Sequence, residues 1–521
     1  MPIEFNFGDD NLTPAIAIGL ASGTHQGKFS TIAKERIDRS AAHVTGIVER
    51  KKTVYGVNTG FGILADTEIS EEDTRLLQYK ILQSHSVGVG DPVPDSIVRL
   101  MLITKLQSLA LGYSGVQFTT LERICWHLDN NILPVVPEKG SVGASGDLAP
   151  LAHLFLPLIG LGEVLYKGTR MPTHEMMLQE SVEPLQLGPK EGLALINGTQ
   201  FILAYGLSGL ARMHNCLEAA DIIGAMSLES LTGTKAPFDE RLHRLRPFNG
   251  NQLVAQRLRL LLNNSGIMQS HLDCGRVQDP YSLRCMPQVH GASRNAWLHL
   301  KEALLTELNS VTDNPLIFSS ADTISGGNFH GQPLALPLDY ATLAAAEIGN
   351  ISDRRCYLLL EGKYGLPLLL MNKVGLNSGF MIPQYTTAAL VSENKSLCFP
   401  ASADSIPTSL GQEDHVSMGS ISARKLNTVL GNLEYILGIE LMSACQAIEF
   451  RRPLKSSIIL EFAHDFVRQF VSFADEDRIF AQDINRISAT ISDGSFVKHC
   501  TAFAEKTGIM LNNGYPDYDL G

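Results

Sequence analysis

Long stretches of apolar residues with few prolines dominate the chain after about residue 200. Four of them are rich in Ala and Leu, and they cover residues 202–228, 293–308, 338–360 and 417–450. Several carry apolar residues on more than one face, which is typical of helices buried inside a bundle. Strand signals are few and short. The pattern therefore predicts a mainly α protein built around a bundle of long helices.

The first 200 residues differ because Gly and Pro interrupt them often. Residues 95–133 have apolar positions at three- and four-residue spacing, which predicts mostly helix up to Pro134 and Pro137. We expect a smaller mixed N-terminal part over residues 1–200 and an elongated helical bundle over residues 201–521. The boundary is approximate because no Gly/Ser/Pro-rich linker marks it, and a single continuous unit is the alternative.

Composition and charge exclude several kinds of partner. The 521 residues are 44% hydrophobic and carry a net charge of −12, which disfavours nucleic acid as a partner. The longest apolar stretch, residues 151–165, is short and interrupted for a membrane span, and the acidic N-terminus does not resemble a signal peptide. The eight cysteines include no Cys-x-x-Cys pair. We therefore expect a cytoplasmic protein with reduced thiols, no metal site and no membrane partner.

An Ala-Ser-Gly tripeptide within GSVGASGDLAPL (140–151) is the most informative motif. The nitrogen of Gly146 can attack the carbonyl carbon of Ala144, and loss of two waters converts Ser145 into a methylidene. Gly is needed because its nitrogen must fold back at backbone dihedrals that other residues avoid. The product, a 4-methylidene-imidazol-5-one, is an electrophile that needs no external cofactor. The alternative is a Gly-rich turn in which Ser145 or Asp147 caps the next helix.

The sequence around this tripeptide resembles the signature of the aromatic amino acid ammonia-lyase family, which comprises histidine, phenylalanine and tyrosine ammonia-lyases and related aminomutases. Other segments resemble the family in the same order: YGVNTGFG (55–62), EGLALINGT (191–199), YSLRCMPQVHG (281–291), LNSVTDNP (308–315), SGGNFHGQ (325–332) and GQEDHVSMG (411–419). The resemblance covers most of the chain, from about residue 50 to 450. It implies an ammonia-lyase-like, mostly helical fold, the electrophilic ring, and a homotetramer whose active sites are shared between subunits.

Loss of ammonia from an α-amino acid requires removal of a weakly acidic proton from the β-carbon. The electrophile makes the amine a better leaving group, and the protein must add a base and an anchor for the carboxylate. The resemblance makes Tyr55 the first candidate for the base. It also places Tyr281 in the site, against the electrophile or the amine, and Arg284, whose planar guanidinium matches a carboxylate.

Four more positions are expected to bind the substrate. The resemblance makes Asn197 a ligand of the substrate amine, the carboxylate or the ring carbonyl, although an Asn-Gly turn is the ordinary alternative. Gln278 is expected to add a polar contact, and Phe329 to form a wall of the pocket. His85 resembles the position that sets selectivity, where histidine argues against a phenylalanine substrate more than it argues for histidine.

Glu413 is the sharpest indicator of the substrate. Phenylalanine and tyrosine lyases usually have Asn-Gln-Asp at this point, whereas Gln-Glu-Asp followed by His-Val-Ser-Met resembles the histidine-type members. A carboxylate can accept a hydrogen bond from an imidazole N–H, and a phenyl ring would leave it unpaired at a cost of roughly 1–3 kcal/mol. The expected reaction converts L-histidine to trans-urocanate and ammonia, the first step of histidine degradation.

Several alternatives stay open at this point. Glu413 can act as the base in place of Tyr55, or it can be an acidic residue at a helix N-terminus. A tyrosine ammonia-lyase or an aromatic amino acid aminomutase would use the same residues. A helical assembly protein without catalysis is a more remote alternative, and it would keep the tripeptide uncyclised.

Overall fold

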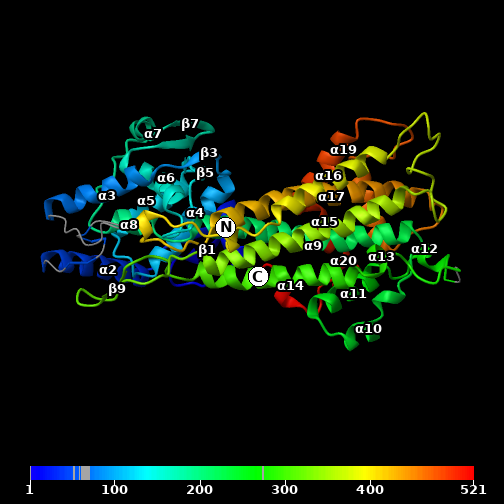
Figure 1. Cartoon of the computed structure of the whole chain (residues 1–521), viewed down its shortest axis with the longest axis horizontal. Coiled ribbons are helices and arrows are strands. Elements are labelled where there is room, and N and C mark those ends of the chain that lie inside the picture. Colours follow the sequence, from blue (N-terminus) through cyan, green and yellow to red (C-terminus); the bar gives the residue numbers. More distant parts are fainter. Residues whose placement is uncertain (1, 51–52, 55, 58, 60–70, 273–274) are drawn as a thin grey trace.

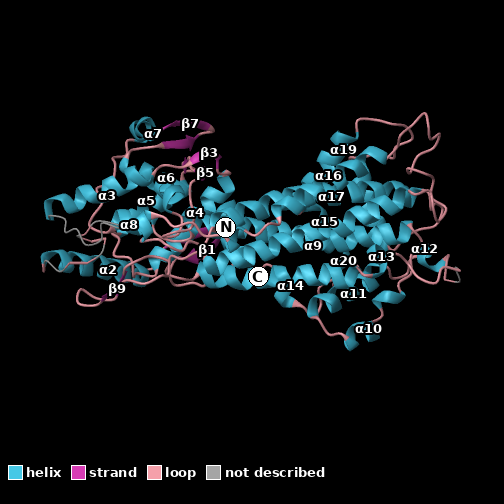
Figure 2. Cartoon of the chain, in the orientation of Figure 1, coloured by secondary structure: helices cyan, strands magenta, loops and turns pink. Residues whose placement is uncertain are grey.

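The structure is a computed structural model that describes residues 2–521 apart from 51–52, 55, 58, 60–70 and 273–274. Helices predominate over a few short strands, as Figure 2 shows. Figure 1 shows long helices side by side at one end of an elongated molecule and a mixed part with the strands at the other. The prediction of a mainly α protein with a long-helix bundle is confirmed.

Four long helices form the centre of the bundle (Figure 1). They are α9 (Gln200–Ser230), α14 (Met286–Leu308), α15 (Gln332–Leu360) and α17 (Gly419–Glu449). α17 packs against both α9 and α15, and α14 packs against α15 and α9. Each corresponds to one of the predicted apolar stretches. α14 and α15 begin several residues earlier than predicted, because each has a proline in its first turn, where a missing N–H removes no helical hydrogen bond.

Shorter helices surround these four at the bundle end. They are α10 (Glu240–Leu245), α11 (Asn249–Leu261), α12 (Gly266–Gln269), α13 (Tyr281–Arg284), α16 (Met381–Leu397), α18 (Ile458–Arg468), α19 (Phe480–Ser492) and α20 (Ser495–Lys506). The helices of the mixed end are α1 (Pro14–Ser22), α2 (Thr31–Glu49), α3 (Glu71–His85), α4 (Asp95–Ala110), α5 (Phe118–Asp129), α6 (Leu148–Phe155), α7 (Thr173–Glu180) and α8 (Glu191–Ile196).

The strands pair in small, separate sheets. β1 (Ile3–Asn6) is parallel to β2 (His25–Lys28), whereas β3 (Val89–Pro92) is antiparallel to β5 (Pro137–Lys139). β6 (Glu163–Tyr166) lies between β4 (Leu133–Pro134) and β7 (Thr169–Pro172), and β8 (Leu316–Ile317) pairs with β9 (Thr323–Ile324).

The helix predicted over residues 95–133 is two helices in the structure. α4 ends at Ala110 and α5 begins at Phe118. Gly112 and Gly115, with φ of 78° and 71°, take left-handed conformations that a helix cannot contain. The apolar spacing continued across this break, so it did not reveal the turn. The proposed division near residue 200 stays a prediction. In the part of the chain described here, no helix is long and apolar enough to cross a membrane.

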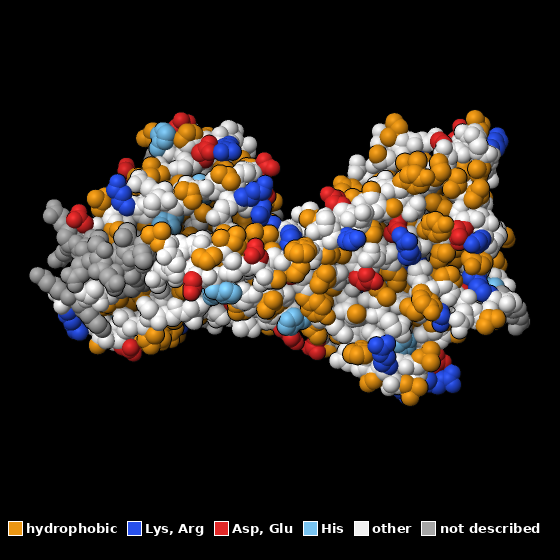
Figure 3. Space-filling model, viewed as in Figure 1, with side chains coloured by type: hydrophobic (Ala, Val, Ile, Leu, Met, Phe, Trp, Pro, Cys, Tyr) orange, Lys and Arg blue, Asp and Glu red, His pale blue; other side chains and the backbone are white. Residues whose placement is uncertain are grey.

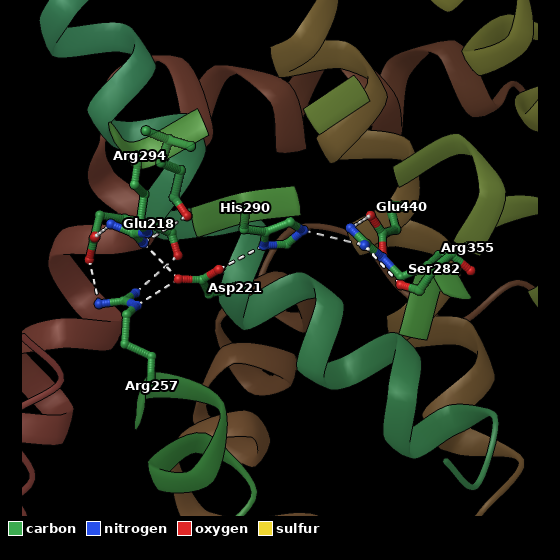
Figure 4. A network of polar contacts seen from close by, with 9 residues as sticks. Glu218, Asp221, Arg257, Ser282, His290, Arg294, Arg355 and Glu440 are labelled. Carbon is green, nitrogen blue, oxygen red and sulfur yellow. Dashed lines mark hydrogen bonds and ion pairs between the residues drawn. The ribbon is translucent and has the colours of Figure 1, made fainter. Parts of the chain in front are cut away.

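The bundle core contains a buried cluster of opposite charges, shown in Figure 4. Glu218 and Asp221 on α9 face Arg257 of α11 and Arg294 of α14, and all four side chains are nearly inaccessible to solvent. Asp221 accepts hydrogen bonds from Arg257 Nε at 2.7 Å and Arg294 Nη2 at 2.6 Å. Burial by itself raises the pKa of Glu218, but the guanidinium groups of Arg257 and Arg294 outweigh it and bring that pKa to about 2.

His290 connects this cluster to a second buried ion pair (Figure 4). Its Nδ1 lies 2.7 Å from Asp221 Oδ1, and its Nε2 lies 3.4 Å from Arg355 Nη1. A carboxylate can only accept and a guanidinium can only donate, so His290 is neutral with its proton on Nδ1. Burial also lowers its pKa. Arg355 pairs with Glu440 and donates to the carbonyl of Ser282 at 3.4 Å, which links α13 to the bundle core.

Candidate active site

The Ala-Ser-Gly tripeptide forms a tight loop between β5 and α6. Gly146 has φ of 78°, and a Cβ added to it would lie 2.1 Å from the carbonyl oxygen of Gly198. Only glycine fits this position, because any other side chain would overlap that backbone. Ala144 is buried, and the Ser145 side chain is half-buried. The loop therefore has the tight backbone geometry that the sequence predicted for residues 144–146.

A second turn, Asn197–Gly198 between α8 and α9, holds the tripeptide from behind. Gly146 and Gly198 form a parallel β-bridge. The N–H of Gly198 donates to the carbonyl of Ser145 at 3.3 Å, and the N–H of Asp147 donates to the carbonyl of Gly198 at 2.8 Å. Asn197 does belong to an Asn-Gly turn, which was the alternative to a role in binding the substrate. This turn is also the surface against which the tripeptide packs.

Asp147 stands at the N-cap of α6, yet its carboxylate makes no capping hydrogen bond to that helix. It accepts instead from Ser141 Oγ at 3.0 Å and from the backbone N–H of Ile202, in the first turn of α9, at 2.9 Å. Burial raises the pKa of Asp147 to about 7, although these hydrogen bonds oppose the shift. Ser145 does not cap α6 either, because the N-cap residue is Asp147 and no side-chain capping hydrogen bond is present there. The simple capping alternative therefore does not describe this loop.

A cavity of about 560 Å³ opens in front of the tripeptide. Five of the predicted site residues line it: Ala144, Ser145, Asn197, Phe329 and Glu413. They come from four segments that are far apart in the sequence. A cavity of this size is in the range that proteins use for small molecules.

Glu413 faces the tripeptide across this cavity. Its Oε1 accepts a hydrogen bond from Ser145 Oγ at 3.0 Å, and its Oε2 accepts one from Thr408 Oγ1 at 2.9 Å. A backbone bridge between Thr408 and Glu413 fixes the loop. Because α17 begins only at Gly419, Glu413 is not an acidic residue in the first turn of a helix.

Asn197 lines the cavity, whereas His85 is not among the lining residues and is close enough to Glu413 only for its charge to be felt. Asn197 is 2% exposed, and its Oδ1 has no hydrogen-bond partner within the described residues. A buried acceptor without a partner is unusual, and it is open to a donor on a ligand. His85 ends α3 with its Nδ1 3.0 Å from Ser84 Oγ. Burial lowers its pKa, and a contact with the backbone of Ile81 and the charge of nearby Glu413 partly offset this.

Three predicted residues lie elsewhere. Figure 1 shows α13 at the opposite end of the molecule from α6 and α8. Gln278 and Tyr281 are exposed there, and the Arg284 guanidinium stacks over the Tyr281 ring at 4.6 Å. The Nε of Arg284 is buried without a partner among the described residues. A single chain therefore does not bring these residues to the cavity. Tyr55 lies outside the described residues.

Four residues at or next to the cavity were not among the predicted site residues. Thr408 holds Glu413, and nothing in its spacing or type marked it. His330 and His415 line the cavity with their rings stacked 5.8 Å apart. Asn314 also lines the cavity. It falls in LNSVTDNP, so the resemblance of that segment was the available signal.

The chain is similar over most of its length to known proteins. The family model described as aromatic amino acid lyase matches residues 12–469. A histidine ammonia-lyase of Natranaerobius thermophilus is 47% identical over 475 residues, which cover 91% of this chain and 94% of that protein. One of Sorangium cellulosum is 49% identical over 486 residues, covering 91% and 95%.

Solved structures agree with these sequence comparisons. The crystal structure of histidine ammonia-lyase from Trypanosoma cruzi has a TM-score of 0.88 and 40% identity, and the match covers 96% of each chain. The tyrosine aminomutase from Streptomyces globisporus has a TM-score of 0.92 at 34% identity, covering 98% of this chain and all of that one. The chain belongs to the aromatic amino acid lyase family.

Proposed function

We propose that the protein catalyses the non-oxidative deamination of L-histidine to trans-urocanate and ammonia. The observation that carries this proposal is the carboxylate of Glu413, which faces Ser145 across the cavity at 3.0 Å. An apolar ring would leave this carboxylate without a partner, whereas the N–H of an imidazole can donate to it. Relatives named histidine ammonia-lyase, at 46–49% identity over about nine-tenths of the chain, support the same substrate.

We propose that the electrophile is a 4-methylidene-imidazol-5-one formed from Ala144, Ser145 and Gly146. The residues present fit this ring. Gly146 takes a left-handed φ that glycine readily adopts and has no side chain beside its nitrogen, and the Ser145 carbonyl, which becomes the ring carbonyl, is already held by the N–H of Gly198. When formed, the ring supplies the electrophile that makes the substrate amine a better leaving group.

Ring formation also changes what Glu413 can do. The hydroxyl that now donates to its Oε1 is the one that leaves as water, so in the mature protein this oxygen is free to accept from the substrate. Asn197 Oδ1 is the second open acceptor, suited to the ammonium group. Phe329 adds an apolar wall. The base is Tyr55 or Glu413, and the proposal leaves both open.

We further propose a homotetramer in which α13 of one subunit completes the cavity of another. Tyr281 is 70% exposed, and Arg284 keeps a buried nitrogen without a partner among the described residues. Figure 3 shows apolar side chains exposed over the bundle. Leu336, Tyr340 and Leu343 form an exposed apolar stripe along one face of α15. Such surfaces are typical of subunit interfaces.

A cytoplasmic location is part of the same proposal. The seven cysteines that the structure describes are all free thiols. Free and mostly buried thiols suit a reducing compartment.

Ultraviolet assays with L-histidine, L-tyrosine and L-phenylalanine test the substrate. We expect urocanate absorbance with histidine alone, and an intact mass lower than the sequence mass by two waters. The Ser145→Ala variant should keep its fold and lose both the mass difference and the turnover. Cinnamate-type product from tyrosine or phenylalanine but none from histidine would contradict the substrate assignment. A β-amino acid product would favour an aminomutase.

A further inference from the structure

A buried lysine lies directly behind the Asn197–Gly198 turn. Lys105 is on α4, where almost every neighbouring side chain is buried, and it is itself 1% exposed. Its Nζ lies 2.6 Å from the carbonyl oxygen of Asn197 and 3.5 Å from Gln200 Oε1. Burial lowers the pKa of Lys105 to about 7, and the charge of Asp313 partly opposes this. Both the charged and the neutral amine carry N–H groups, so either form can donate to Asn197.

Other buried polar groups hold the same turn. Gln200 Nε2 donates to Thr312 Oγ1 at 2.9 Å, and Thr199 Oγ1 donates to Glu307 on α14. A Cβ on Gly198 would lie 2.6 Å from Thr312 Oγ1, so the turn packs tightly against that segment. Lys105 is the group that reaches the carbonyl between Asn197 and Gly198 from α4. None of these side chains lies among those predicted to act on the substrate.

The front of the turn is the surface on which the tripeptide rests. Gly198 donates to the Ser145 carbonyl and accepts from the Asp147 N–H, so a shift of the turn would move residues 145–147 with it. Cyclisation requires the nitrogen of Gly146 to be held close to the carbonyl carbon of Ala144. A misplacement of about 1 Å is enough to slow a reaction between two positioned groups on the order of a hundredfold.

We propose that Lys105 is a positioning residue for the cyclisation of Ala144, Ser145 and Gly146, acting through the Asn197–Gly198 turn. This inference rests on the proposed function, because it assumes that the ring forms.

The covalent step is a double dehydration. The Gly146 nitrogen bonds to the Ala144 carbonyl carbon, and the Ala144 oxygen leaves as water with the protons of the Gly146 and Ser145 nitrogens. The Ser145 hydroxyl then leaves as a second water with the Ser145 Cα proton. No oxidant, reductant or co-reactant is needed.

The chain offers a matched control for Lys105. Lys190, at the N-cap of α8, is also a fully buried lysine. Its Nζ donates to Asp313 at 2.5 Å and to the carbonyl of Ser114 at 3.0 Å. These hydrogen bonds do not reach the Asn197–Gly198 turn. Replacing Lys190 by Met therefore removes a buried amine of the same kind without removing the hydrogen bond from Lys105 to the Asn197 carbonyl.

The test is the intact mass of the purified wild type and of Lys105→Met, Lys105→Arg and Lys190→Met, with circular dichroism to show that each is folded. We expect the wild type, Lys105→Arg and Lys190→Met to be two waters lighter than their sequences. At least about half of the Lys105→Met chains should keep both waters, with activity lowered in the same proportion. If Lys105→Met does not fold, Lys105→Gln, one atom shorter and neutral, is used with the same expectation.

Three other results would contradict either this proposal or the proposed function. Complete loss of two waters in the folded Lys105 variant would overturn the proposal. Equal retention of water in the Lys190 variant would overturn it too, because destabilisation alone would then explain the effect. A wild-type chain that keeps both waters would instead contradict the electrophile of the proposed function, so the two failures can be told apart.

Discussion

Replacing Glu413 by Gln tests how the site selects its substrate. The side chain keeps its size, and the amide oxygen can still accept from Thr408 or from the substrate, but the negative charge is lost. A hydrogen bond to a charged group contributes about 1.5–3 kcal/mol, more than the roughly 0.5–1.5 kcal/mol of a neutral one. The proposed ring formation removes the Ser145 hydroxyl that donates to Glu413 Oε1, so the charge-assisted bond would then be available to the imidazole. Exchanging this bond for a neutral one loses about 1–1.5 kcal/mol, which corresponds to about a 5- to 13-fold decrease in kcat/KM for L-histidine.

The assay follows urocanate absorbance at several histidine concentrations and from about pH 4 to about pH 10, a range that includes the ordinary titration of a Glu carboxyl. The intact mass is measured first, because Glu413 contacts Ser145 and only matured chains can be compared. Asp404→Asn is the matched control. Asp404 is an exposed carboxylate that precedes the same loop and does not line the cavity, so we expect kcat/KM within about twofold of the wild type.

Two results would refute the reasoning. If matured Glu413→Gln keeps kcat/KM for histidine within twofold of the wild type, the carboxylate does not recognise the imidazole. If instead kcat falls with KM unchanged and the acidic limb of the pH profile disappears, Glu413 acts as the base and not as the group that selects the substrate. A gain of activity toward phenylalanine alongside the loss for histidine would support the recognition role most directly.

Three further outcomes follow from the structure. Gly146→Ala should abolish the loss of two waters in the intact mass, because its Cβ would lie 2.1 Å from the Gly198 carbonyl; a fully matured variant would contradict this. Asp221→Asn should lower the free energy of unfolding in urea by about 3–5 kcal/mol, because it leaves buried guanidinium groups without their charged partner. The control is Glu240→Gln in an exposed ion pair, which should change this free energy by about 0.5 kcal/mol or less. Equal effects of the two would refute the burial argument. Glu218 has a pKa of about 2 in the folded protein, against about 4.3 in the unfolded chain. Its charge therefore stabilises the protein above about pH 4.3, and this contribution is lost as the pH falls toward about 2. Urea midpoints should decline over that pH window, and a flat profile would contradict the depressed pKa.

The long helices could be predicted from the sequence because their apolar positions recur over many turns. The start of α15 could not be predicted in this way. Pro333 and Pro337 lie in its first turns, and proline normally argues against a helix, so only the structure shows that the chain is already helical there. The break between α4 and α5 was missed for a related reason. Apolar spacing indicates which faces of a helix are buried. It does not indicate the left-handed turn that Gly112 makes between two buried helices.

Five of the predicted site residues line the cavity, but the sequence did not predict how they come together. The motifs identified Ser145 and Glu413, yet 268 positions separate them, and no sequence spacing indicates that their side chains meet. The motif at residues 281–291 is equally clear, but the fold carries Tyr281 and Arg284 away from the cavity of their own chain. A motif therefore does not show whether its residues reach the cavity of their own chain.

The buried charges described in the bundle core have a consequence for assembly. α9 has 31 residues and is therefore about 46 Å long, with the Asn197–Gly198 turn directly before it and Asp221 in its second half. A slip of one turn between neighbouring helices, about 5.4 Å, would pull Asp221, His290 and Arg355 out of contact. The charges thus fix the register of the helices, and with it the separation between α13 at one end and the cavity at the other. In the proposed homotetramer, this fixed separation sets how far α13 of one subunit reaches toward the cavity of another.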